Sequence, residues 1–179
     1  PDAQVTDSAP SMAAYMTGVK SNNGVISMDS DATQESDCSQ SGGKAVTTLL
    51  ELAKADGRGT GVVTTTRVTH ATPAATYAHI CNRDLEADIA VQMVPGGSGY
   101  NTALKEGLDV VLGGGSGFFL PSADKGKRTD GRKPVSVESA TAARSRLKAR
   151  PLGQPADDLQ PALPVALALH LNLHRDAFV

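Results

Sequence analysis

The pattern of apolar and polar positions along the chain predicts helices that alternate with short buried strands. Small apolar residues follow Asp7 and Ser8, with Pro10 in the first turn and Gly18 at the end, which is typical helix punctuation. Further helices are expected at 44–56, 73–83 and 86–93, and apolar runs predict buried strands at 61–66 and 108–112. This alternation favours an α/β fold with a mostly parallel sheet.

The segments between these elements indicate where a ligand would bind. Residues 21–43 are rich in Ser, Asn, Asp and Gly, so we expect a surface loop there. Parallel sheets bind their ligands at the carboxyl ends of the strands. Residues 64–72 and 113–117 follow the two predicted strands, and we expect any site to lie beside them.

Composition narrows the class of protein. The 179 residues suffice for one domain, and 17 Lys and Arg against 19 Asp and Glu argue against a general nucleic-acid binder. Hydrophobic residues are 40% and aromatic residues only 3%, so the core must be mainly aliphatic. No window of about 18 apolar residues exists, which excludes a membrane span. One bridge between Cys38 and Cys81 is possible, but nothing in the sequence requires it.

The two ends of the chain suggest a piece of a longer protein. The chain opens at Pro1 with neither an initiator methionine nor a secretory signal. Of its 18 glycines, only Gly153 follows residue 132. We therefore divide the chain into an α/β unit at 1–131 and an atypical tail at 132–179, rich in Ala, Leu, Arg and Pro, which we expect not to join the sheet. An out-of-frame reading of a GC-rich gene would give such a tail, and ordinary divergence is the alternative.

Ser8 and Arg83 are the first candidates for chemistry. A serine at a helix N-terminus lies beside free backbone N–H groups, which favour an alkoxide or a bound phosphate. An arginine can grip two phosphate oxygens at once. The simpler alternatives are that Ser8 is a helix N-cap and that Arg83 is a solvated arginine near a helix end.

His70 and Thr72 form a second candidate group, in the loop after the first predicted strand. Thr72 could ligate a hard cation such as Mg²⁺, and His70 could hold a ligand or water nearby. An N-cap role for Thr72, ahead of Pro73, is equally consistent with the sequence. The glycines at 113–115 lack the Gly-Lys-Ser/Thr ending of a phosphate loop, so a structural turn is expected there.

Several blocks of sequence together resemble the alkaline phosphatase family. VTDSA at 5–9 and YMTGVK at 15–20 resemble its nucleophile segment. VTTTRVTHATPA at 63–74, with YAH at 77–79 and NR at 82–83, resembles its next block, and VVLGGG at 110–115 is a third match. The blocks occur in the family's order, and the resemblance covers about residues 1–131.

The resemblance implies hydrolysis of phosphate monoesters with two Zn²⁺ and one Mg²⁺, on an incomplete three-layer α/β/α sandwich. Ser8 would be the nucleophile and a zinc ligand, and Arg83 would bind the phosphate oxygens. Asp7 would orient Arg83, while Thr72 and His70 would lie at the magnesium site. His70 stands where some bacterial members carry aspartate, whereas animal-type members carry histidine. The family also implies a periplasmic or secreted homodimer.

Most of the metal ligands that the resemblance implies are missing from this chain. The family's metal-bridging aspartate lies upstream of the nucleophile, and its Asp-x-x-x-His block, its Asp-His pair and a later histidine do not occur here. We therefore predict a phosphatase fragment that lacks activity alone. The alternative is a non-catalytic module that binds anions without metals. A P-loop nucleotide-binding protein is excluded because the phosphate-loop lysine is absent.

Overall fold

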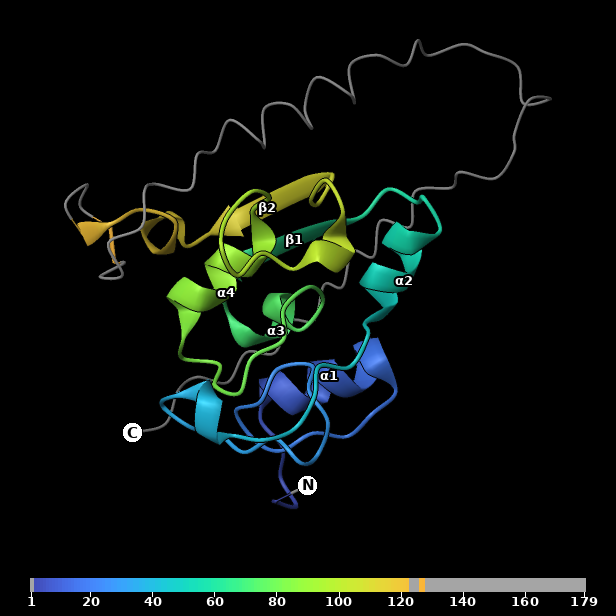
Figure 1. Ribbon diagram of the computed structural model, residues 1–179, viewed down its shortest axis with the longest axis vertical. Helices are drawn as coiled ribbons and strands as arrows, with labels where there is room; N and C mark the ends of the chain where they lie inside the picture. The colour runs from blue at the N-terminus through green and yellow to red at the C-terminus, as the bar shows by residue number, and fades with distance from the viewer. Residues whose placement is uncertain (1, 123–125, 128–179) are drawn as a thin grey trace, which may run out of the picture.

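The computed structural model describes residues 2–122 and 126–127, so the predicted tail at 132–179 lies outside the described residues. Figure 1 shows α1 on one side of α3 and the small sheet on the other, with α2 beside them. The packing follows this order, since α1 contacts α3 and α3 contacts β1. Within the described part of the chain, no helix is long and apolar enough to cross a membrane.

The two predicted strands are present and lie parallel in one sheet. Strand β1 spans Gly61–Arg67 and strand β2 spans Val110–Gly114, with Val62 opposite Val111. β2 begins two residues later than predicted and continues into the glycine run. The glycines at 113–115 are therefore not a simple turn, because the first two lie in β2 and Gly114 pairs with Arg67 of β1. The described residues thus form a mixed α/β unit with a small parallel sheet.

Helix α1 spans Ser8–Thr17, as its punctuation predicts. Gly18 ends it in the left-handed conformation with φ +74°, which glycine adopts without steric cost. Its N-cap is Asp7, whose carboxylate accepts a hydrogen bond from the backbone N–H of Ala9. The alternative that Ser8 is the N-cap is therefore wrong, because Ser8 is already the first helical residue.

Helix α2 spans Leu49–Ala55 and is shorter than the predicted helix at 44–56. Thr48 caps it, and its hydroxyl and the Glu51 side chain form a reciprocal capping box. The preceding residues pair elsewhere, since Ala45 bridges Met28 in an antiparallel arrangement. Residues 44–48 were predicted to be helical from their apolar spacing, but a contact with a distant segment replaces the helix there.

Helix α3 spans only Ala71–Ala74, so the prediction of a helix over 73–83 is wrong. Three consecutive carbonyls that a longer helix would use, those of residues 75–77, accept hydrogen bonds from distant side chains. The donors are the hydroxyls of Ser27 and Thr48 and the amide of Asn101, each at 2.7 Å. The N-cap of α3 is His70, so the alternative role of Thr72 as an N-cap is also wrong.

The remaining elements connect these parts. Helix α4 spans Glu86–Met93, as predicted. Three short 3₁₀ helices complete the described chain. They are η1 at Cys38–Gln40, η2 at Thr102–Leu104 and η3 at Ser116–Phe118.

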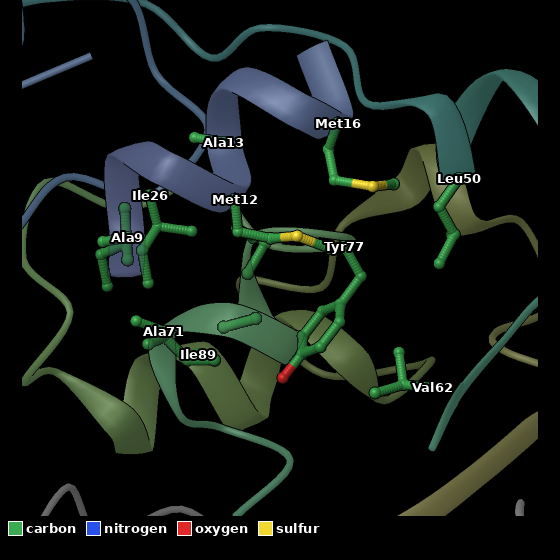
Figure 2. Close-up of a cluster of buried hydrophobic side chains, with 14 of the residues drawn as sticks. Ala9, Met12, Ala13, Met16, Ile26, Leu50, Val62, Ala71, Tyr77 and Ile89 are labelled. Atoms are coloured by element: carbon green, nitrogen blue, oxygen red, sulfur yellow. The ribbon is translucent and has the colours of Figure 1, made fainter. Parts of the chain in front are cut away.

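The core is aliphatic apart from one tyrosine. In Figure 2, Met12 of α1 extends toward Tyr77, and Met16 of α1 extends toward Leu50. Tyr77 is fully buried, and its hydroxyl donates to the carbonyl of Val68 at 2.9 Å. A buried phenol is tolerated because its O–H has this partner.

The segment at 21–43 is irregular, as predicted, but part of it lies in the core. Val25 and Ile26 are fully buried, and Ile26 exchanges two backbone hydrogen bonds with Ile80. A disulfide joins Cys38 to Cys81. This segment therefore holds the region of Cys81 through both main-chain and covalent ties.

A buried polar network joins α2 to this region. His79 donates to the carboxylate of Glu51 at 2.7 Å and, from its other ring nitrogen, to the carbonyl of Ser27 at 2.8 Å. The pKa of Glu51 is lowered and that of His79 is raised by these hydrogen bonds, which favours an ionised Glu51 and a protonated His79 that donates from both ring nitrogens. Asn101 and the backbone N–H of Thr48 also donate to Glu51. Glu51 and His79 thus form a largely buried ion pair in which both carboxylate oxygens accept hydrogen bonds.

Candidate active site

Ser8 and Arg83 meet although 75 residues separate them. Nη1 of Arg83 donates to Oγ of Ser8 at 2.9 Å. Ser8 is the first residue of α1, where the backbone N–H groups lack intrahelical acceptors and the helix dipole is positive. The hydroxyl therefore lies between a guanidinium and a helix N-terminus, and both stabilise negative charge on it.

Asp7 fixes this arrangement from the other side. Its Oδ1 lies 3.6 Å from Nη1 of Arg83, and its Oδ2 accepts a hydrogen bond from the backbone N–H of Gly24 at 2.8 Å. The backbone N–H of Asp7 itself donates to the side chain of Asn23 at 3.1 Å. One carboxylate thus caps α1, binds the 23–24 turn and attracts the guanidinium.

His70 contacts the second terminal nitrogen of the same guanidinium. Nε2 of His70 lies 3.1 Å from Nη2 of Arg83. A guanidinium only donates, so Nε2 is the acceptor in this contact. Arg83 is therefore held at one nitrogen by Ser8 and Asp7 and at the other by His70.

Thr72 does not join this group. It lines a mostly apolar cavity of about 80 Å³ between α1, α2, β1 and α3, with Met12 and Leu50 among its walls. Among the described residues, no hydrogen bond links Thr72 to Ser8 or Arg83. Of the five residues that the sequence singled out, the structure brings together four, namely Asp7, Ser8, His70 and Arg83.

The described residues do not assemble a metal site by themselves. Within 2–122 and 126–127, no three His, Cys, Asp or Glu side chains gather closely enough to hold a metal ion. The acceptor nitrogen of His70 is occupied by Arg83, and Thr72 faces a cavity with an apolar lining. The zinc and magnesium that the resemblance implies therefore do not fit this set of residues without further ligands.

A second charged cluster supports the loop that carries His70. Arg67, at the end of β1, makes a two-pronged pair with the carboxylate of Glu86 at the start of α4, and Thr69 donates to the same carboxylate. Burial would raise the pKa of Glu86, but these hydrogen bonds outweigh it and lower the pKa. The cluster fixes the start and the middle of the loop from β1 to α3 against the start of α4.

Sequence reasoning missed the residues that hold Arg83 in place. Gly24 accepts a hydrogen bond from the backbone N–H of Arg83 at 2.8 Å, and no local pattern marks it for this role. Cys81 lies two residues before Arg83 and is bonded to Cys38. The presence of two cysteines was the feature of the sequence that pointed to this support, but it did not establish that they form a disulfide.

Comparisons with known proteins give the family. The family model described as alkaline phosphatase matches residues 1–149. The match therefore extends past residue 131, where the resemblance seen in the sequence motifs ends. The tissue-nonspecific isozyme of alkaline phosphatase from Homo sapiens is 40% identical over 134 residues, covering 67% of this chain and 24% of the isozyme. A membrane-bound alkaline phosphatase of Bombyx mori is 38% identical, over 75% of this chain and 27% of its own length.

A solved structure agrees with the sequence comparison. Alkaline phosphatase from the Antarctic bacterium TAB5 superposes with a TM-score of 0.56 and 31% identity, over 79% of this chain and 33% of that enzyme. A variant of the TAB5 enzyme has been solved with magnesium bound. The chain spans a third or less of the length of these relatives, and its described fold is part of theirs. It belongs to the alkaline phosphatase family.

Proposed function

We propose that the chain contributes the nucleophile and the phosphate-binding arginine of a phosphate monoesterase that works through a phosphoserine. The observation that carries this proposal is the 2.9 Å hydrogen bond from Arg83 to Ser8 at the start of α1. Oγ of Ser8 would form a bond to phosphorus while the bond from phosphorus to the ester oxygen breaks, and the ester oxygen would leave as an alcohol after the Ser8 hydroxyl gives up its proton. Water would then cleave the phosphoserine and release inorganic phosphate.

Each neighbouring residue would have a defined part in this reaction. Arg83 would donate to two non-bridging phosphate oxygens, because its two terminal nitrogens already face the site. Asp7 and His70 would keep the guanidinium in that orientation. The positive end of α1 would attract the charge of the bound phosphate. The two Zn²⁺ and one Mg²⁺ of the family would need ligands beyond the described residues, so we derive no step through them.

The setting of the whole protein follows as part of the same proposal. We propose a periplasmic or secreted phosphatase on a three-layer α/β/α sandwich, of which this chain supplies a part. The disulfide between Cys38 and Cys81 supports an oxidising compartment, because such bonds persist mainly outside the reducing cytosol. The homodimer implied by the resemblance stays a prediction.

Binding of inorganic phosphate tests the site. We expect Arg83→Ala and Ser8→Ala to weaken phosphate binding, the former by at least about tenfold, as measured by calorimetry or ³¹P NMR. Arg58→Ala is the matched control, since it removes the same charge from a half-exposed arginine whose salt bridge within the described residues is with Asp56. Phosphate affinity that is unchanged by Arg83→Ala would exclude the proposed site.

Turnover tests the chemistry. We expect the 179-residue chain to hydrolyse p-nitrophenyl phosphate no faster than its Ser8→Ala variant, even with Zn²⁺ and Mg²⁺ supplied. Metal-dependent turnover that Ser8→Ala abolishes would show that the chain does complete a metal site. Phosphate binding that is the same with chelator and with metals would favour the non-catalytic anion-binding module.

A further inference from the structure

Arg83 lies outside regular secondary structure. It follows the irregular residues 75–82 and precedes α4, so no helical ladder of hydrogen bonds fixes its backbone. Its N–H donates to the carbonyl of Gly24 at 2.8 Å. A residue that must present its side chain to Ser8 thus depends on contacts from distant segments.

The strongest of these distant ties is covalent. Cys81, two residues before Arg83, is fully buried and is bonded to Cys38 in η1, with the two Cα atoms 5.4 Å apart. Between them, Asn82 donates from its side chain to the carbonyl of Glu35 at 3.1 Å. Residues 35–38 therefore hold residues 81–82, which directly precede Arg83, in place.

This tie acts on the geometry that the site requires. The guanidinium must reach Ser8 and His70 at the same time, with separations of 2.9 and 3.1 Å. A shift of the Arg83 backbone by about 1 Å would break one or both contacts, and displacements of that size are costly at active sites. The tether limits such shifts because Cys81 cannot move away from η1.

We propose that the Cys38–Cys81 disulfide positions Arg83 for phosphate binding, so that Cys81 is a positioning residue of the site. This inference rests on the proposed role of Ser8 and Arg83 as a phosphate site. The disulfide holds the backbone of residues 81–83 against Gly24, and the guanidinium is presented to Ser8 already oriented. Without the bond, part of the binding free energy is spent on ordering Arg83.

The test compares the full oxidised chain with Cys38→Ala/Cys81→Ala, using inorganic phosphate as the probe. We expect phosphate binding to weaken by about tenfold in the double variant. Leu104→Ala is the matched control, because it truncates a fully buried core side chain in η2 and should leave phosphate affinity within about twofold. An equal loss of affinity in Leu104→Ala would overturn the proposal, since general destabilisation would then suffice.

A double-mutant cycle separates positioning from general stability. In an Arg83→Ala background, removal of the disulfide should leave phosphate affinity unchanged, because the group that it positions is gone. The same fold-loss in both backgrounds would refute the positioning role. If Cys38→Ala/Cys81→Ala loses the amide protection of β1, the single variant Cys38→Ala, which keeps the buried Cys81 side chain, replaces it.

Amide hydrogen exchange decides the inference even if the chain binds no phosphate. In that case the proposed function fails, while the tether can still be measured. The Arg83 amide should exchange at least about tenfold faster in the double variant, whereas the amide of Val62 in β1 keeps its rate. Equal exchange of the Arg83 amide in the two chains would overturn the inference.

Discussion

Replacing Glu51 by glutamine should destabilise the fold by about 3 kcal/mol, although the two side chains have almost the same shape. The Glu51 side chain is 4% exposed and that of His79 is 14% exposed. One carboxylate oxygen accepts from His79 and Asn101, and the other accepts from the backbone N–H of Thr48. Both carboxylate oxygens of Glu51 therefore face donors, and glutamine replaces one of these oxygens with an NH₂ group.

The magnitude follows from the count of donors. A glutamine has one acceptor oxygen, so its NH₂ group must face either Thr48 or the pair formed by His79 and Asn101. Either orientation leaves a buried donor without a partner, which costs about 1–3 kcal/mol. The charge of His79 also loses its partner, and breaking one side of a buried ion pair costs about 3–5 kcal/mol when neither group can relax. Because His79 can release a proton, we expect the lower end of that range.

The pH dependence of unfolding gives a second readout. Burial would lower the pKa of His79, but its bonds to Glu51 and Ser27 outweigh burial and raise it above the ordinary 6.5. The stabilisation is therefore complete below about 6.5 and is lost as pH rises through the raised pKa. Burial would raise the pKa of Glu51, but its hydrogen bonds lower it, so its contribution is present above 4.5 and is lost as pH falls through the lowered pKa.

Urea denaturation at a series of pH values measures both effects. The wild-type chain should lose stability above neutral pH more steeply than Glu51→Gln, in which His79 has no anionic partner. Asp56→Asn is the control, because its pair with Arg58 is exposed and should contribute less than about 0.5 kcal/mol. A loss below about 1 kcal/mol in Glu51→Gln, or the same alkaline slope in both chains, would refute the assignment of a buried ion pair.

Two further substitutions test the packing around the sheet. Gly113→Ala should cost about 1–3 kcal/mol, because its Cβ would lie 2.6 Å from Val68 and 2.8 Å from Thr64. Gly59→Ala, where a Cβ meets no atom within 4 Å, should leave the melting temperature nearly unchanged, and equal shifts in the two variants would contradict the close approach. Tyr77→Phe should lower the free energy of unfolding by about 1–2 kcal/mol in urea, since the carbonyl of Val68 loses its buried donor, and no loss would show that water replaces the hydroxyl.

The elements that sequence alone predicted well are those stabilised by local pattern. The β-branched run gave strand β1, and the period of apolar residues gave α4 at its observed bounds. Gly18 marked the end of α1 because a left-handed residue there needs no partner elsewhere in the chain. In each case the residues that decide the structure are neighbours in sequence.

The errors arise where distant side chains replace local hydrogen bonds. The small residues after Pro73 favour a helix, but Ser27, Thr48 and Asn101 take the carbonyls that the helix would need. No periodicity carries that information, since the donors lie 24 to 48 residues away. Tertiary hydrogen bonds thus overrode helix propensity.

Two of the candidate residues are in contact, but the way in which the structure holds them was not predicted. The resemblance singled out Ser8 and Arg83, and spacing suggested that Arg83 ends a helix. The structure places it in an irregular turn held by Gly24 and by the Cys81 disulfide. These supports are long-range pairings, which a single sequence does not encode in any local pattern.

The separation of 75 residues between Ser8 and Arg83 has a consequence for the order of folding. Closing a flexible loop of that length costs about 4 kcal/mol in its length-dependent part alone. A hydrogen bond to a charged group contributes only about 1.5–3 kcal/mol, so the contact cannot close the loop by itself. The packing of α1 on α3 and the bridge from Ile26 to Ile80 must form first. During synthesis, Ser8 therefore emerges before Arg83 and meets it only after the intervening core has condensed.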